Sequence, residues 1–284
     1  MTVALDKAEL QPPSLGERLS MVVSDSITIA KRNVIKIKRV PDVLIFTTLS
    51  PIMFVLLFAY IFGSAISVPG VEGGYREFLI AGIFAQTVVF GATFTGAGLA
   101  EDMQKGIIDR FRSLPMAPSA VLVGRTVSDV VINIVSLVVM SLTGLVVGWR
   151  IRGSFIDAVL AYALMLLFAY ALSWMMAVVG LLLRAPEVFN NASFMVIFPL
   201  TFVSNLFVPL ASLPAPLRVF AEWNPVSALA QAVRELFGNT NPLESPSEAW
   251  SMQHPVITTL VWIVVILIVF VPLAQFQYKK SVSR

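Results

Sequence analysis

The sequence contains no cysteine and only one histidine, His254. Without cysteine, the chain can form neither disulfide bonds nor thiolate metal sites, and it offers no cysteine nucleophile. One histidine is too few for a multi-histidine metal site within one chain. These two shortages argue against most kinds of enzyme, and they predict that the chain binds no metal or cofactor of its own.

Charged residues are also scarce. They make up 13% of the 284 residues, whereas hydrophobic residues make up 57%. A soluble domain contains about 25% charged and about 45–50% apolar residues. The composition is therefore typical of an integral membrane protein, with the lipid bilayer as a partner. The net charge of +3 is too small an excess to indicate nucleic-acid binding.

Long apolar runs predict the spans. A helix needs about 20 apolar residues to cross the hydrocarbon layer. We expect six transmembrane helices, which form an all-α membrane domain over residues 41–284 after a cytoplasmic segment, 1–40. The predicted spans are 43–66, 78–100, 130–149, 158–183, 192–210 and 256–276. None contains a charged residue, so the usual ion-coupling groups of pumps and secondary transporters are missing.

The basic residues predict the orientation of the chain. Fifteen of the 20 Lys and Arg residues fall in the N-terminal segment, the connections after the second and fourth spans, and the C-terminal tail. Cytoplasmic connections carry the excess of Lys and Arg, so both termini are predicted to lie on the cytoplasmic side of the cell membrane. Arg150 and Arg152 oppose this orientation locally, but the neighbouring connections outweigh them.

Two amphipathic segments are predicted on the cytoplasmic side. Leu15–Arg39 combines spaced apolar residues with a terminal basic cluster, which predicts a helix in the membrane interface. Glu101–Leu114 places Met103, Ile107 and Phe111 at helical spacing among charged residues, which predicts a short helix. Such a helix could dock a partner, or it could pack its apolar stripe on the protein's own spans, and periodicity alone does not separate the two.

The outward connection between the fifth and sixth spans predicts two more short helices, 213–222 and 225–237. Asn224 suits the N-cap of the second one, and Pro225 suits its first position. Gly238 suits the position just past its end. These helices would either cap the bundle or dip into the outer leaflet.

Polar residues occur near or within several spans. Arg125 and Asp129 stand four residues apart just before the third span, which predicts an ion pair in solvent or at the interface. Two spans mix uncharged polar with aromatic residues, as would the wall of a cavity for a bulky amphiphile. For any one of these residues, ordinary hydrogen bonding between helices is the simpler explanation. These candidates are Gln86, Phe90 and Thr93 on the second span, and Phe198, Thr201, Phe202 and Asn205 on the fifth.

Two further motifs are missing. The sequence has neither the GxxxxGK[ST] phosphate-binding loop nor the HExxH zinc motif. The chain therefore does not hydrolyse ATP through such a loop, and it lacks the zinc site of metalloproteases. A transporter without coupling charges needs its energy from another subunit. A membrane-embedded enzyme is disfavoured because His254 stands alone, whereas a scaffolding subunit with a docking helix remains an alternative.

Two runs carry a resemblance to a known family. The run Lys105–Arg125 (KGIIDRFRSLPMAPSAVLVGR) and the run Phe198–Phe237 (FPLTFVSNLFVPLASLPAPLRVFAEWNPVSALAQAVRELF) resemble the signature regions of type-2 ABC exporter permeases. Within that family, the daunorubicin-resistance permeases of actinobacteria are the most similar. The likeness extends over nearly the whole chain after about Val34.

The resemblance implies a six-helix half-transporter that exports hydrophobic or amphiphilic, drug-like compounds. Export of a lipid or polysaccharide carrier is the alternative. A second permease chain, identical or related, would complete the pair, and two copies of a separate ATPase subunit would bind ATP and Mg²⁺. The helix between the second and third spans would enter a groove on the ATPase. The resemblance places these residues at that contact: Asp109, Arg110, Phe111, Arg112, Leu114 and Pro115. It also implies a cavity lined by the second and fifth spans.

Overall fold

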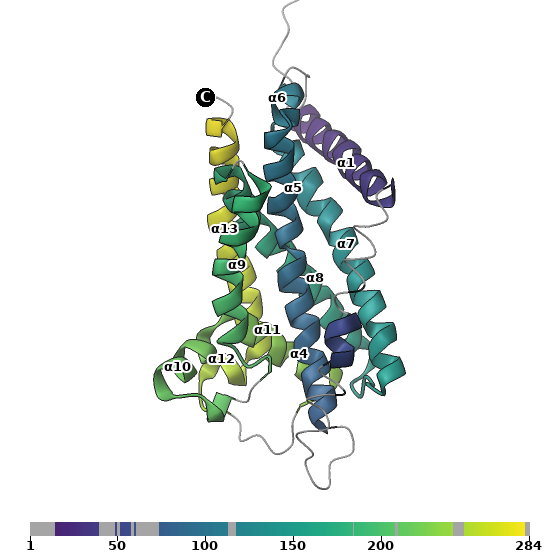
Figure 1. Cartoon of the computed structure of the whole chain (residues 1–284), viewed down its shortest axis with the longest axis vertical. Coiled ribbons are helices and arrows are strands. Elements are labelled where there is room, and N and C mark those ends of the chain that lie inside the picture. Colours follow the sequence, from purple (N-terminus) through teal and green to yellow (C-terminus); the bar gives the residue numbers. More distant parts are fainter. Residues whose placement is uncertain are drawn as a thin grey trace, which may run out of the picture.

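The computed structural model describes residues 15–39, 49, 52–57, 60, 74–112, 118–183, 185–207, 210–240 and 247–281. The regular secondary structure in these residues is entirely helical. Figure 1 shows a bundle of long helices, with α1 (Leu15–Arg39) packed beside it near the end where the C-terminus lies. The short helices α10 (Ala215–Trp223), α11 (Pro225–Phe237) and α12 (Trp250–Gln253) lie at the opposite end.

Four helical segments of the described chain are long and apolar enough to cross a membrane. They cover Arg76–Gln104, Ser119–Val147, Phe155–Leu182 and Pro255–Lys280, which correspond to the predicted second, third, fourth and sixth spans. Within the predicted first span residues 52–57 are helical, and most of the rest lies outside the described residues. The fifth prediction, 192–210, overlaps α9 (Pro186–Phe202), which begins and ends earlier than expected.

The second span consists of two helices, α4 (Gly74–Gly91) and α5 (Thr93–Gln104), which meet at Ala92. The third span belongs to α7 (Pro118–Val147), which begins well before the predicted start at Val130. At the junction of α4 and α5, the side chain of Asn133 from α7 occupies the space that a Cβ on Gly91 would fill. The absent side chain of this glycine therefore lets a polar group of α7 rest against the junction.

Helix α8 (Phe155–Leu182) runs through the middle of the bundle and packs against α5, α7 and α13 (Pro255–Ser281). Ser154 caps its first turn, and Asp157 completes a capping box. At the crossing with α5, a Cβ on Gly180 would overlap the backbone of Gly96. The two glycines thus allow the two helices to touch backbone to backbone, which is the close packing that small residues permit between membrane helices.

The two outer helices are α10 (Ala215–Trp223) and α11 (Pro225–Phe237), close to the predicted ranges. The side chain of Asn224 accepts a hydrogen bond from the Val226 amide at 2.8 Å, and Gly238 takes the left-handed conformation with φ of 68°. Both predicted caps of α11 are therefore confirmed. Helix α11 is buried in the bundle as a cap, whereas α10 leaves Val219, Phe220 and Trp223 exposed.

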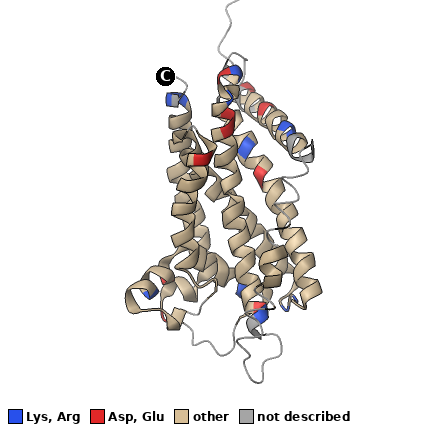
Figure 2. Ribbon diagram, in the orientation of Figure 1, with Lys and Arg blue, Asp and Glu red and all other residues tan. Residues whose placement is uncertain are grey.

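Charged residues gather toward the end that carries α6 (Ile107–Arg112) and the C-terminus, with a smaller group at the opposite end (Figure 2). At that opposite end, Arg152 donates two hydrogen bonds to Glu77, at 2.8 and 2.9 Å, and so joins the α7–α8 connection to α4. Arg234 of α11 is fully buried although it is charged. Its guanidinium lies 3.5 Å from the ring centre of Phe78 and donates to the Leu206 carbonyl.

Candidate functional site

The segment predicted as one helix, Glu101–Leu114, is interrupted at Gly106. Gly106 has φ of 65°, a left-handed conformation that favours glycine. Helix α5 therefore stops at Gln104, and α6 starts as a separate six-residue helix. The prediction of a single helix was wrong because its spaced apolar residues continue past a glycine that turns the backbone.

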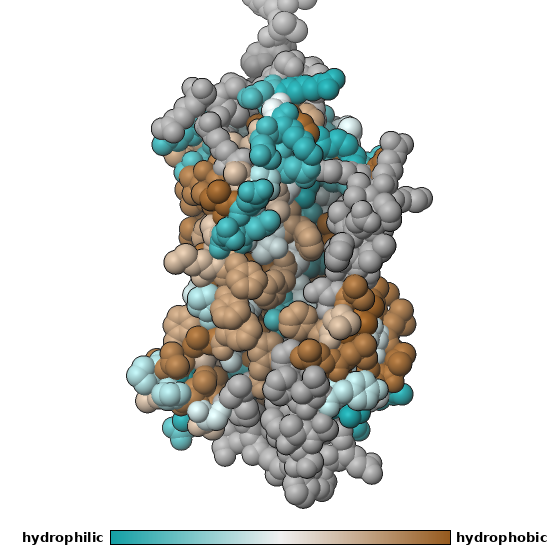
Figure 3. Space-filling view, in the orientation of Figure 1, coloured by the Kyte–Doolittle hydropathy of each residue, from teal (hydrophilic) through white to brown (hydrophobic). Residues whose placement is uncertain are grey.

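Helix α6 has an anchored side and an exposed side. Ile108 is buried in an apolar cluster that includes Leu99 and Trp174, and Phe111 packs at the edge of the same cluster. Asp109 and Arg110 are exposed. In the space-filling view, hydrophilic residues collect at this end of the molecule (Figure 3). The apolar stripe thus packs on the protein's own helices and the charged residues face outward. Leu114, Pro115 and the side chain of Arg112 lie outside the described residues.

Arg32 of α1 lies where three helices meet. Its guanidinium donates to the carboxylate of Asp102 on α5 at 3.2 Å, and Asp102 has 5% of its side chain exposed. The same guanidinium lies 4.8 Å from the ring centre of Phe111 on α6, a cation–π geometry. It also donates to the side chain of Asn33 at 2.9 Å. Arg32 therefore connects α1, α5 and α6 through one side chain.

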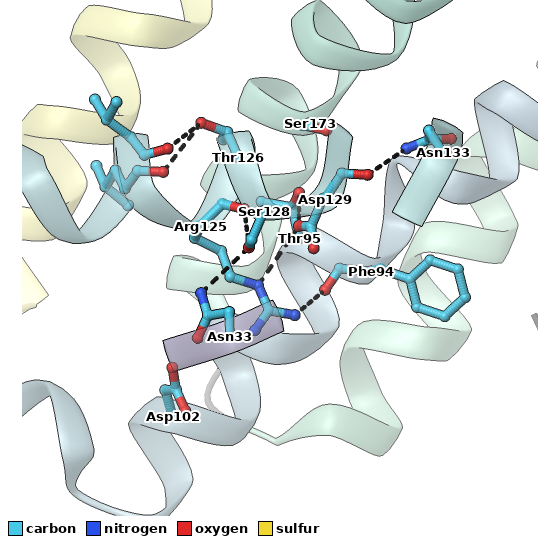
Figure 4. Close-up of polar contacts among 12 residues, drawn as sticks. Asn33, Phe94, Thr95, Asp102, Arg125, Thr126, Ser128, Asp129, Asn133 and Ser173 are labelled. Carbon is cyan, nitrogen blue, oxygen red and sulfur yellow. Dashed lines mark hydrogen bonds and ion pairs between the residues drawn. The ribbon is translucent and has the colours of Figure 1, made fainter. Parts of the chain in front are cut away.

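Arg125 and Asp129 of α7 form a buried ion pair, with 13% and 1% of their side chains exposed and 3.5 Å between Arg125 Nε and Asp129 Oδ2. Thr95 of α5 donates to the same carboxylate, and Arg125 donates to the Phe94 carbonyl at 2.9 Å (Figure 4). The predicted ion pair is therefore present, but it is buried between helices and does not lie in solvent. The guanidinium lies against α5 at Gly98, where a Cβ would overlap it, so this helix shields the pair from solvent.

Further hydrogen bonds join this ion pair to its neighbours. Asn33 donates to the Ser128 hydroxyl at 3.3 Å, and this hydroxyl donates to the Arg125 carbonyl at 2.6 Å. Asn133 donates to the Asp129 carbonyl at 2.9 Å, beside the α4–α5 junction. These contacts connect α1, α5 and α7 through the interior. We call the connected set the polar seam, and its members are Arg32, Asn33, Thr95, Asp102, Arg125, Ser128, Asp129 and Asn133.

A second group of candidates forms an aromatic row on α9. The rings of Phe198 and Phe202 stack with centres 4.0 Å apart, and Phe194 stacks on Phe198 at 5.4 Å. Phe90 of α4 meets Phe194 at 6.2 Å, and Phe207 meets Phe202 at 5.8 Å. The second and fifth predicted spans therefore meet through phenylalanines. Phe194, Phe198 and Phe202 remain 54%, 42% and 51% exposed. We call these five residues the phenylalanine row.

The polar candidates on the fifth span lie elsewhere. Thr201 is fully buried and donates to the Ile197 carbonyl of its own helix at 2.9 Å. Asn205 is 3% exposed, its backbone amide donates to the Ser227 hydroxyl, and it lies beyond the end of α9. The four candidates on the fifth span therefore do not form one wall: Thr201 is on a buried side of α9, Asn205 follows the helix, and Phe198 and Phe202 are exposed.

The polar candidates on the second span are also enclosed. Gln86 is buried. Thr93 is partly buried and donates to the Phe90 carbonyl at 2.7 Å, which engages its hydroxyl within its own chain segment.

Sequence reasoning missed the polar seam and Phe194. The residues of the seam are distant in sequence, and only the packing of α1 and α5 on α7 brings them together. One signal was present: Arg125 and Asp129 directly precede an uncharged run, and the apolar Val121, Leu122 and Val123 precede them. A helix that continues apolar on both sides of an i,i+4 pair indicates that the pair is enclosed. For Phe194, the i,i+4 spacing to Phe198 and Phe202 was available.

Residues 25–237 match the family model described as ABC-2 type transporter. The chain belongs to this family. The match takes in the polar seam, α6 and the phenylalanine row, and it ends with the last residue of α11.

Relatives of this permease include proteins named for drug resistance in Streptomyces and Mycobacterium. The daunorubicin resistance ABC transporter permease protein DrrB1 of Streptomyces coeruleorubidus is 35% identical over 229 residues, which cover 80% of each chain. The doxorubicin resistance ABC transporter permease protein DrrB of Mycobacterium tuberculosis is 28% identical over 198 residues, which cover 70% of this permease and 68% of the relative. The resemblance read from the two sequence runs is confirmed.

Proposed function

We propose that this permease forms the membrane part of an ATP-driven exporter and docks a separate ATPase subunit through α6. Two permease chains, identical or related, would each engage one ATPase copy, and ATP with Mg²⁺ would bind the ATPase. ATP binding would draw the two ATPase copies together and move the docked helices. Such coupling requires that the ATPase contact two permease conformations differently.

The exposed charged side of α6 carries this proposal. Ile108 and Phe111 hold the helix to the bundle, so Asp109 and Arg110 are presented to a partner at low ordering cost. Helix α6 lies at the same end as the C-terminal end of α13 (Figure 1). The excess of basic residues in these segments supports a cytoplasmic location for this end in the cell membrane. Cysteines at Gln104 and Gln253, both exposed, should therefore react with impermeant reagents from opposite sides of the membrane.

The cargo proposed is a hydrophobic or amphiphilic compound. The phenylalanine row exposes stacked rings, which bind apolar or cationic aromatic molecules through their faces. The names of the relatives, which refer to daunorubicin and doxorubicin resistance, support a drug-like cargo. A lipid or polysaccharide carrier is the alternative within the same fold, and vesicles loaded with each class of compound would distinguish the two.

Docking is tested by reversing charge on α6. Asp109→Arg and Arg110→Asp should each reduce co-purification of the ATPase, because a wrong charge at an interface is costly to desolvate. Glu187→Arg changes an exposed carboxylate on α9 and serves as the matched control. Normal co-purification and export by both α6 variants would refute the docking role.

The cargo site is tested by comparing two residues of the fifth span. Phe198→Ala should change which compounds are exported while the amount of folded permease is unchanged, because specificity is a difference between affinities. Asn205→Leu should instead lower stability and reduce export of every compound in proportion, since the Asn205 side chain is buried and its Nδ2 donates to Gln231 Oε1 at 3.5 Å. A resistance profile normalised to folded permease separates these results. A uniform loss with Phe198→Ala would show that the row only packs the bundle.

A further inference from the structure

Helix α6 is attached to the bundle by its covalent link to α5 and by side-chain contacts. The link is a turn through Lys105 and Gly106, both exposed, in which the Gly106 amide donates to the Met103 carbonyl at 3.1 Å. Ile108 and Phe111 pack in the apolar cluster of the bundle, and Arg32 of α1 lies over the Phe111 ring. Movement of α6 therefore reaches the bundle through these side chains as well as through the turn.

Of these three side chains Arg32 is the polar one, and it contacts both α6 and α5. Its planar guanidinium covers the Phe111 ring on one side and donates to Asp102 at 3.2 Å on the other. Asp102 lies in the last turn of α5, with 5% of its side chain exposed. A displacement of α6 that moves Phe111 therefore acts through Arg32 on the end of α5.

The polar seam holds the other half of α5. Thr95, in its first turn, donates to the Asp129 carboxylate, and Arg125 donates to the Phe94 carbonyl. Helix α5 is thus held near both ends by charged partners. Ala92, between α4 and α5, keeps helical dihedral angles and its amide donates to the Val88 carbonyl at 3.2 Å, so α4 and α5 form one continuous span. Phe90 of the phenylalanine row lies two residues before Ala92, so a shift of α5 would be passed along this span to Phe90.

Stability alone does not account for a seam of this kind. A buried ion pair is about as stabilising as apolar residues of the same volume, and often less so, whereas it enforces one arrangement of its helices. We propose that Arg32 is a positioning residue for energy coupling: it ties α6 to α5, so that movement of a docked ATPase is passed to α5 and along its span. This inference rests on the proposed function.

The experiment uses the permease with its ATPase subunit in phosphatidylethanolamine–phosphatidylglycerol vesicles. The cysteine-free chain allows a single bimane label at Ala97→Cys, a partly buried position on α5. The readout is the change in bimane fluorescence on addition of ATP and Mg²⁺. We expect Arg32→Ala to reduce this change at least about fivefold while the ATPase still co-purifies. Asp102→Asn, which removes the charge that Arg32 pairs with on α5, should reduce it likewise, and Lys31→Ala, an exposed neighbour on α1, should not affect it.

Each other result overturns the inference. If the unmodified complex shows no ATP-dependent change at Ala97, α5 does not move. If Arg32→Ala behaves like the unmodified chain, the tie has no role, and if it loses the ATPase, Arg32 belongs to the docking surface. Should Arg32→Ala fail to fold, Asp102→Asn decides, since a folded Asp102→Asn permease with an unchanged ATP-dependent signal contradicts the pairing. Failure of the unmodified permease to retain any ATPase would overturn the proposed function itself, before any variant is made.

Discussion

Separate removal of Arg125 and Asp129 tests whether the two side chains act as a pair. Arg125→Met would leave the Asp129 carboxylate, 1% exposed, with Thr95 as its side-chain donor. Asp129→Leu would leave the Arg125 guanidinium, 13% exposed, bonded to the Phe94 carbonyl. The double variant would remove both charges and place apolar side chains of similar size between α5 and α7.

The expected free energies follow from this geometry. Removal of one partner from a buried ion pair costs about 3–5 kcal/mol, whereas replacement of both by apolar residues is often about neutral. Arg125→Met should show the full loss because Asp129 has almost no access to water. Asp129→Leu should cost less, about 1–3 kcal/mol, because the guanidinium keeps a carbonyl acceptor. The coupling energy of the cycle should then exceed the ~0.5 kcal/mol scatter of independent sites.

Unfolding of the four permeases by sodium dodecyl sulfate in mixed micelles measures these free energies. The control is the exposed pair Glu101 and Lys105, also at i,i+4, with 32% and 56% of the side chains exposed. Glu101→Leu with Lys105→Met should leave the unfolding free energy almost unchanged, because exposed pairs contribute little. Additive losses at Arg125 and Asp129 would refute the pairing.

Three other outcomes are expected. Gly180→Ala should lower the unfolding free energy by about 1–3 kcal/mol, because its Cβ would overlap the Gly96 backbone, whereas Gly16→Ala, with nothing within 4 Å, should not; detergent melting compares them. If α10 lies in the outer leaflet, brominated lipids should quench the fluorescence of Trp223 in a variant that keeps this tryptophan alone. Unquenched fluorescence would place α10 in water. Burial raises the pKa of Glu235 above its ordinary value of 4.5, so between pH 4.5 and the raised pKa the folded chain binds more protons than the unfolded one. The free energy of unfolding should therefore fall as pH rises through this interval. Melting curves recorded at a series of pH values should lose this pH dependence in Glu235→Gln.

The main elements of the fold were predictable from the sequence because their physical cause is local. Long uncharged runs must be helical in a bilayer, since every backbone group needs an internal partner there. The caps at Asn224 and Gly238 act within one turn of their own helix, so residue type alone locates the ends of α11. The helix Leu15–Arg39 also follows from local spacing. The turn at Gly106 was readable in principle, but the continuing apolar spacing concealed it.

Tertiary structure alone decided which polar residues are enclosed. Arg125 and Asp129 have the spacing of a solvated surface pair, and only the approach of α5 at Gly98 removes them from water. Arg234 looks like part of a polar face, yet the burial of α11 places it over Phe78. Thr201 and Phe202 are neighbours in sequence, but one is buried and the other is 51% exposed. Burial depends on which helix packs against a residue, and that partner is specified by residues far away along the chain.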